Sequence, residues 1–380
     1  MTQILRGNIV HAPEMGRLDI LEHGCLVLED GVITGLYRQL PEELANAEVR
    51  DFGDRILMQS FADMHLHAPQ YPMLGMGMDL PLLDWLNTYT FPTEARFADV
   101  DYARRVYRRL ATDLITNGTT RVCMFSSLHT DATLVLMDEL ERAGVTGYVG
   151  KVNMDRNGLP GKLQETTEES VRETLRWLDG CHFEHVKPII TPRFTPSCTN
   201  ELMTQLGKLA NERGLYVQSH LSENTNEIAW VRELHPDCTQ YWETYNKYGM
   251  WKDHTLMAHC VHSDERERCA IKDAGVVVVH CADSNVNICS GICPVRQMVR
   301  EGLWVTLGSD IAGGAQLPMY KVITMSIRTS KARRVTDEWH PDFLTVPEGY
   351  YLGTTAGHKY FGAGDGFAVG DRLHAVVIDD

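Results

Sequence analysis

The chain has 380 residues, of which 43% are hydrophobic and 23% charged, and its formal net charge is −15. This is the composition of an ordinary globular protein, and the negative charge argues against non-specific binding to nucleic acid or to an anionic membrane surface. No stretch approaches about 18 consecutive apolar residues, and the first residues lack the long apolar region of a signal peptide, so we expect a cytoplasmic protein.

Short strands with tight turns are expected near the N-terminus, over residues 4–10, 25–28 and 32–37. Glu29-Asp30-Gly31 separates the last two runs, and an Asp-Gly pair between apolar runs is typical of a hairpin turn. Residues 373–378 near the C-terminus form a similar apolar run. The sequence therefore predicts a small β-sandwich built from both chain ends, over residues 1–55 and 366–380.

Between these ends, short apolar runs alternate with amphipathic segments. The runs are rich in β-branched residues, as expected for strands buried on both faces, and cover residues 56–61, 119–125, 146–149, 186–191, 215–220, 255–259, 276–280 and 304–308. Helix signals lie between them, such as the capping box of Thr166-Thr167-Glu168-Glu169 and the Asn117-Gly118 pair that ends a helix over residues 102–115. Eight strands alternating with helices predict an α/β fold, a (β/α)8 TIM barrel over residues 56–365.

Polar side chains gather where these strands end, and there (β/α)8 barrels carry their chemistry. His65 and His67 are two residues apart in an extended run, so both point to the same side. His220 ends strand five and Asp310 follows strand eight. Three imidazoles and one carboxylate suit Zn²⁺ with an open position for water, and Fe²⁺ also accepts such ligands. Strand four ends in Thr191-Pro192-Arg193, without a lysine that could bridge two metals, so we predict one zinc ion.

The same region supplies groups that can move protons. Glu223 follows strand five and is placed either to act as general acid and base or to cap a helix over residues 224–234. His259 ends strand six and is expected beside the metal, where it would orient or stabilise the attacking nucleophile. Asp310 could accept a proton from a metal-bound water, whose pKa falls from 15.7 to about 7, or could instead cap a helix. His280 is interpreted as a structural histidine with hydrogen bonds in the barrel mouth.

Ten cysteines are scattered along the chain without a C-x-x-C pair. In a cytosolic protein we expect them to be reduced and mostly buried. Cys289 and Cys293 could clamp a metal ion, but no second pair completes a structural zinc set.

Together these motifs resemble the amidohydrolase superfamily and, within it, the guanine deaminase family. The resemblance runs from about Met58 to about Gly314 and rests on residues 65–71 (HLHAPQY), 80–86 (LPLLDWL), 89–94 (YTFPTE), 188–194 (PIITPRF), 219–224 (SHLSEN) and 308–310 (GSD). It implies a barrel of the metal-dependent hydrolase type with zinc bound by His65, His67, His220 and Asp310. It also implies a homodimer and a purine site formed by Gln70, Arg193, Phe194 and Glu223, beside His220 and Asp310.

The residue types of the implied purine site agree with its chemistry. Arg193 is a forked donor suited to the acceptor edge of guanine, formed by O6 and N7, although a salt bridge at the barrel mouth is the alternative. Phe194 offers a ring for stacking, or simple core packing. Gln70 can both donate and accept a hydrogen bond, so it suits a ring nitrogen edge.

The sequence and the resemblance together predict a zinc aminohydrolase that converts guanine to xanthine and ammonia. Glu223, Asp310 and His259 are the expected catalytic residues. Two alternatives remain open: the same chemistry on another purine, a pterin or a triazine-like ring, and an inactive metal-bearing barrel that serves as a scaffold.

Overall fold

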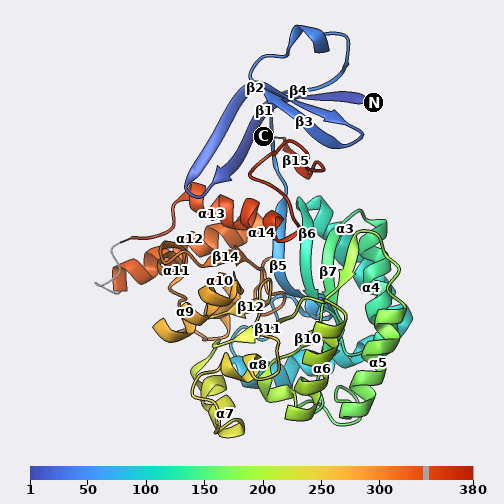
Figure 1. The fold of residues 1–380 in the computed structure, drawn as a ribbon, viewed down its shortest axis with the longest axis vertical. Helices are drawn as coiled ribbons and strands as arrows, with labels where there is room; N and C mark the ends of the chain where they lie inside the picture. Colours follow the sequence, from blue (N-terminus) through green and yellow to red (C-terminus); the bar gives the residue numbers. More distant parts are fainter. Residues whose placement is uncertain (337–341, 380) are drawn as a thin grey trace.

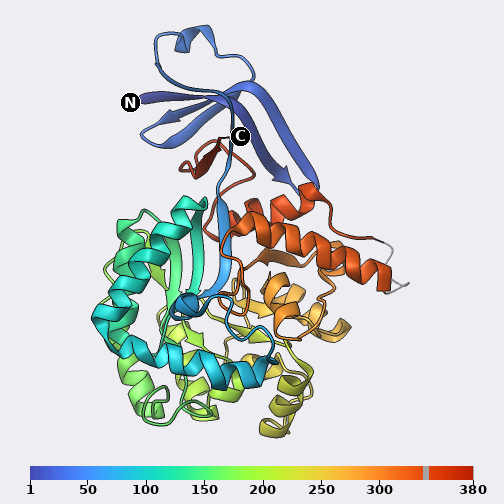
Figure 2. The same cartoon turned by 180° about the vertical axis from the view of Figure 1, so that it is seen from behind.

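The structure is a computed structural model that describes residues 1–336 and 342–379. It consists of a small β sheet, formed by both chain ends, and a larger mixed α/β body (Figure 1). The sheet lies beyond one end of the body in both views (Figures 1 and 2). Residues 337–341 and residue 380, which belong to the two predicted domains, lie outside the described residues.

The small sheet has five strands in the order β15-β4-β1-β2-β3. They are β1 (Thr2–Glu14), β2 (Arg17–Glu29), β3 (Val32–Tyr37), β4 (Glu48–Gln59) and β15 (Ala375–Ile378). The strands predicted at both chain ends are confirmed, and so is the hairpin turn, where Asp30 and Gly31 have φ angles of 50° and 80°. The described residues form a single sheet here, and a second sheet that would complete a sandwich is not among them.

The apolar run over residues 56–61 is divided between the two parts of the molecule. We predicted one strand, but β4 ends at Gln59 and β5 begins at Phe61. Polar contacts hold this junction, since Gln59 accepts a hydrogen bond from the Ala12 amide and the Ser60 amide donates to the His374 carbonyl. Polar Gln59 and Ser60 stand at the break, but the run is too short to show from sequence that its two halves belong to different sheets.

The body contains two four-stranded parallel sheets, ordered β5-β6-β7-β9 and β11-β12-β13-β14. Their strands are β5 (Phe61–His67), β6 (Thr119–Phe125), β7 (Thr146–Gly150), β9 (Val186–Pro188), β11 (Gln218–Leu221), β12 (Leu256–His259), β13 (Val277–His280) and β14 (Trp304–Leu307). The predicted strand over residues 186–191 is divided between β9 and the short strand β10 (Thr191–Pro192). Strand β10 pairs in parallel with β8 (Val152–Asn153).

Backbone hydrogen bonds join the two parallel sheets at both ends. The Gln218 amide donates to the Ile190 carbonyl over 2.9 Å, at the end next to β9 and β11. At the other end, the Asp310 amide donates to the His65 carbonyl over 2.8 Å, and the His67 amide donates to the Ile311 carbonyl over 2.9 Å. These bonds bring the ends of β5 and β14 together.

Helices follow the strands, as the alternating pattern predicts. They are α1 (Leu82–Trp85), α2 (Phe91–Ala95), α3 (Val100–Thr116), α4 (Thr130–Arg142), α5 (Thr167–Asp179), α6 (Asn200–Glu212), α7 (Thr225–Leu234), α8 (Glu243–Asn246), α9 (Glu265–Ala274), α10 (Ala282–Asn287), α11 (Val295–Arg300), α12 (Met319–Thr336), α13 (Val346–Gly353) and α14 (Thr355–Tyr360). The capping box at Thr166 and Glu169 is confirmed. Helices α13 and α14 lie between the body and the small sheet (Figure 1). Among the described residues, no helix has the length and apolar character needed to cross a membrane.

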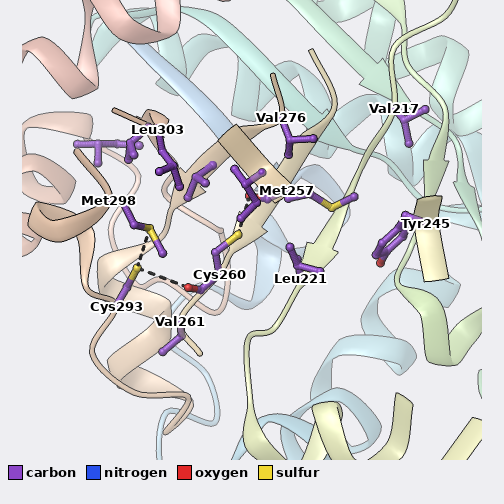
Figure 3. Packing of buried hydrophobic residues seen from close by; sticks show 14 of the residues in the cluster. Val217, Leu221, Tyr245, Met257, Cys260, Val261, Val276, Cys293, Met298 and Leu303 are labelled. Atoms are coloured by element: carbon purple, nitrogen blue, oxygen red, sulfur yellow. Dashed lines mark hydrogen bonds between the residues drawn. The ribbon is translucent and has the colours of Figure 1, made fainter. Parts of the chain in front are cut away.

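Most cysteines lie in the apolar core, as predicted, and all ten are free thiols. Figure 3 shows Cys260 and Cys293 packed among aliphatic side chains beside β12, with Cys293 Sγ 3.9 Å from Met298 Sδ. Cys289 is exposed, whereas Cys293 is buried, so this pair does not form a metal clamp. The buried cysteines therefore contribute to packing.

His374 connects the small sheet to the body and is expected to make stability sensitive to acid. Its Nδ1 lies 2.8 Å from Thr120 Oγ1, and burial, assisted by Arg121 and Arg372, lowers its pKa to about 3. His374 takes up a proton near pH 6.5 in the unfolded chain, but only near pH 3 in the folded chain. The contribution of neutral His374 to the free energy of unfolding is therefore present above pH 6.5. It is lost as the pH falls towards 3, by up to about 1.4 kcal/mol per pH unit.

We expect the melting temperature of His374→Asn to fall less steeply than that of the wild type between pH 6.5 and 4.5. Thermal unfolding at a series of pH values measures this slope. The matched control is His23→Asn, which replaces an exposed histidine of the small sheet that takes no part in this contact with the body. Equal slopes for all three proteins would contradict the assignment to His374.

Candidate active site

The predicted metal ligands lie together where β5, β11 and β14 end. His67 Nε2 is 3.2 Å from His220 Nε2, and Asp310 Oδ1 is 3.2 Å from His65 Nε2 and 3.6 Å from His67 Nε2. All four side chains are buried. Strand alternation turns both histidines of β5 to the same side, and the backbone bonds between β5 and the segment after β14 bring Asp310 to them.

The cluster has the donor set and the unsatisfied atoms of a cation site. His220 Nδ1 donates to the Arg193 carbonyl over 2.5 Å, so its Nε2 turns an unprotonated lone pair towards His67. His65 Nε2 has no hydrogen-bond partner among the described residues. Lone pairs that face one another in a buried site are costly, and a divalent cation between them removes this cost. These residues can therefore hold a divalent metal ion.

The pKa values of these side chains favour metal binding. Burial lowers the pKa of His67 and of His220 well below 6.5, so both imidazoles are neutral. Burial alone would raise the pKa of Asp310, but the neighbouring His65 holds the pKa of this carboxyl below its usual range. Neutral imidazoles and an ionised carboxylate are the forms that bind a cation.

His259 lies beside this cluster, where we predicted it. Its Nδ1 is 2.8 Å from Asn285 Oδ1, and its Nε2 is 3.5 Å from Glu223 Oε2 and 3.8 Å from Asp310 Oδ2. Burial opposes protonation, but the carboxylates of Glu223 and Asp310 raise the pKa of His259 above 6.5. His259 can therefore present a proton to a group bound between these carboxylates.

Glu223 is not used as a helix cap. Asn224 caps α7, and its capping-box partner is Glu227. Glu223 is buried and accepts a hydrogen bond from Ser290 Oγ over 3.0 Å. Burial raises the pKa of Glu223 above its ordinary value, and Glu227 adds to the rise although His259 opposes it. This carboxyl group is thus placed to exchange a proton.

A cavity opens onto these groups. Its lining combines polar residues with an apolar wall from the segment around α1, and consists of His67, Gln70, Leu82, Trp85, Leu86, Arg193, Phe194, His220, Glu223, His259, Ile288 and Asp310. Every predicted catalytic and substrate-binding residue lines it, as do three of the four predicted ligands. A flat heterocycle fits such a mixed lining.

Arg193 and Gln70 share a partner that the sequence analysis missed, namely Glu94 of α2. Arg193 Nη1 donates to Glu94 Oε2 over 2.6 Å, and Arg193 Nη2 donates to Glu94 Oε1 over 3.0 Å. Gln70 Nε2 donates to Glu94 Oε1 over 2.8 Å. Arg193 thus forms the salt bridge that we considered as an alternative, and it also lines the cavity. Glu94 stood in the motif of residues 89–94, but nothing local indicated its partners.

Two interpretations of aromatic residues have different outcomes. Phe194 lines the cavity, with its ring centroid 6.4 Å from that of His220. The interpretation of His280 as a hydrogen-bonded residue is wrong, because neither of its ring nitrogens has a partner among the described residues. Burial lowers the pKa of His280 to about 3, and the positive charge of His259 adds to this effect.

Comparison with known proteins agrees with this geometry. Residues 56–371 match the model of the amidohydrolase family. The chain belongs to this family. An amidohydrolase of Dictyostelium discoideum, guanine deaminase, is 36% identical over 99% of this chain and 88% of its own length. Guanine deaminase of Escherichia coli is 30% identical over 95% of this chain and 82% of its own.

Solved amidohydrolase structures have the same fold. The crystal structure of guanine deaminase from C. acetobutylicum with guanine in its active site is 43% identical, has a TM-score of 0.97 and covers 100% of this chain and 91% of its own. The structure of E. coli guanine deaminase is 28% identical, with a TM-score of 0.89 and coverage of 100% and 89%.

Proposed function

We propose that this amidohydrolase hydrolyses guanine to xanthine and ammonia. The observation that carries the proposal is a single cavity that combines the His and Asp cluster, a buried carboxyl group and the Gln70, Arg193 and Phe194 wall. The 43% identical structure with bound guanine supports the same substrate. In this reaction water adds to C2, the bond from C2 to the exocyclic nitrogen breaks, and ammonia leaves.

The residues of the cavity have separate tasks in this proposal. Arg193 and Gln70 hold the polar edge of the purine, and Phe194 packs against its face. A divalent cation held by this cluster would lower the pKa of a water bound to it from 15.7 to about 7. Glu223 takes a proton from the attacking water and gives it to the ring nitrogen next to C2. His259 donates a hydrogen bond to the oxygen that adds to C2, and Asp310 passes a proton to the leaving amine.

We further propose that the cation is Zn²⁺, held by His65, His67, His220 and Asp310. Three imidazole nitrogens and one carboxylate oxygen suit zinc, and Fe²⁺ is the alternative. A homodimer, which the family resemblance implies, stays a prediction that sedimentation equilibrium can test.

We propose that the body is a closed (β/α)8 barrel and the small sheet a separate domain. The hydrogen bonds at both ends of the two parallel sheets support closure. The predicted units were residues 56–365 and residues 1–55 with 366–380. Because β4 pairs with β1 and β15, we place the first boundary after Gln59.

Metal analysis combined with an ammonia-release assay tests the function. We expect purified protein to contain one zinc ion per chain and to release ammonia from guanine, but not from adenine, cytosine or 8-oxoguanine. Turnover of another compound but not of guanine would show that the guanine-binding roles of Gln70, Arg193 and Phe194 are wrong. Absence of bound metal would contradict the ligand assignment itself.

A further inference from the structure

Helix α2 holds the side chain of Arg193 from two sides. The Glu94 carboxylate receives both terminal nitrogens of the guanidinium, and the Phe91 ring centroid lies 5.1 Å from the guanidinium carbon. Phe91 and Glu94 are three residues apart, so they lie on one face of the helix. Glu94 is only 1% exposed and does not line the cavity. It therefore acts on the cavity only through its neighbours.

The same carboxylate determines which way the amide of Gln70 is turned. Glu94 Oε1 is an acceptor, so it requires the amino group of Gln70, at 2.8 Å. The Gln70 carbonyl oxygen is turned to the opposite partner, the Ala312 amide, at 2.9 Å. An amide held by an acceptor on one side and a donor on the other has a single orientation.

Gln70 and Arg193 keep N–H groups that Glu94 does not use and that can bind a ligand. Gln70 uses one of its two amide hydrogens on Glu94, and Arg193 uses two of its five N–H groups there. Both side chains line the cavity. The free hydrogens form a wall of donors, and the Gln70 oxygen is already engaged by Ala312.

We propose that Glu94 is a positioning residue: it leaves only hydrogen-bond donors of Gln70 and Arg193 available to a ligand, and so selects purines with an acceptor at C6. The inference rests on the proposed function, which it extends to specificity. Guanine offers the acceptors O6 and N7 along this edge. A purine that has the same C2 amine but a second amine at C6 presents a donor there. This donor would face the N–H donors of Gln70 and Arg193 without an acceptor between them.

The Glu94→Gln variant tests the proposal, with 2,6-diaminopurine as the second substrate. The amide of Glu94→Gln can accept or donate, so it no longer requires the amino group of Gln70 and no longer pairs with Arg193 as a charge. We expect Glu94→Gln to lower kcat/KM for guanine by about 10- to 100-fold, as expected for a lost bidentate contact. The ratio of kcat/KM for guanine to that for 2,6-diaminopurine should fall at least about tenfold.

Glu139→Gln is the matched control. Glu139 is also buried and pairs with two arginines, Arg104 and Arg108, but it lies outside the cavity. Both variants leave a guanidinium without its carboxylate and should lose thermal stability. Only Glu94→Gln should change the substrate ratio. Metal content, measured for each protein, shows that the ligand cluster is intact.

Glu94→Asp is the second variant and keeps an acceptor-only carboxylate. We expect it to retain the wild-type substrate ratio within about threefold, even if Glu94→Gln fails to fold. The role of Glu94 would be overturned if the ratio of kcat/KM for guanine to that for 2,6-diaminopurine stayed unchanged in Glu94→Gln, or if it fell in Glu94→Asp as expected for Glu94→Gln. Either result would leave the proposed function intact. Absence of guanine turnover in the wild type would overturn the proposed function and this inference with it.

Discussion

Glu223→Gln is expected to lower kcat for guanine by about 10²- to 10⁴-fold while one metal ion per chain stays bound. The amide has nearly the shape of the carboxyl group, so it can still accept the Ser290 hydroxyl, but it cannot take up and release a proton. Glu223 is not one of the predicted ligands, and therefore the cluster should persist. Ammonia release and metal analysis on the same preparation separate these two effects.

A second buried glutamate provides the control for this variant. Glu267 is also buried and accepts a hydrogen bond from a serine, Ser263, over 2.7 Å, but it does not line the active-site cavity. Glu267→Gln should keep kcat within about threefold of the wild type, because no proton transfer passes through it. Wild-type kcat in Glu223→Gln would exclude Glu223 as the proton carrier and would transfer that role to Asp310 or His259.

The cluster of proposed metal ligands could be predicted because the placement of its residues depends on local rules. The alternation of side chains in a strand puts His65 and His67 on one side. The expectation that polar residues follow buried parallel strands then brings in His220 and Asp310. Neither step requires a contact between particular distant side chains, so a short sequence window is enough.

Glu94 could not be found in this way. Its partner Arg193 is 99 positions away in the sequence, and the meeting depends on how α2 lies over the strand ends. Helix α2 is only five residues long and follows a π-helical turn, so it shows no amphipathic period that would orient it. A buried carboxylate beside a buried guanidinium can be predicted only once the packing of both elements is known.

The break at Ser60 was missed for a related reason. The polar pair Gln59-Ser60 stands at the junction and both of its side chains are buried, but neither feature shows from sequence that β4 and β5 belong to different sheets. The partners that define the break, Ala12 and His374, come from opposite ends of the chain. The predicted alternation of strands and helices was right about which segments are strands, but it could not assign the run over residues 56–61 to two sheets.

Removal of the metal ion is expected to abolish turnover, and His220→Asn should reproduce this effect. Without the cation, water in the cavity has its ordinary pKa, and activation worth several kcal/mol is lost, so kcat should fall on the order of 10³-fold or more. Dialysis against a chelator followed by metal analysis and assay measures both quantities. Added Zn²⁺ should restore the wild type. It should not restore His220→Asn, whose asparagine cannot bring a lone pair to the position of Nε2.

Thermal unfolding gives a readout of metal binding that does not depend on activity. Zinc that binds only the folded chain raises the melting temperature, by an amount that grows with the logarithm of the zinc concentration divided by Kd. The metal-free wild type should therefore be stabilised by added Zn²⁺, and His220→Asn should not. His280→Asn is the matched control, because His280 is also buried, at the end of β13 in the same sheet, but lies outside the cluster. It should keep one metal ion per chain and the stabilisation by zinc. Loss of metal from His280→Asn, or its retention by His220→Asn, would show that the ligands have been assigned to the wrong strands.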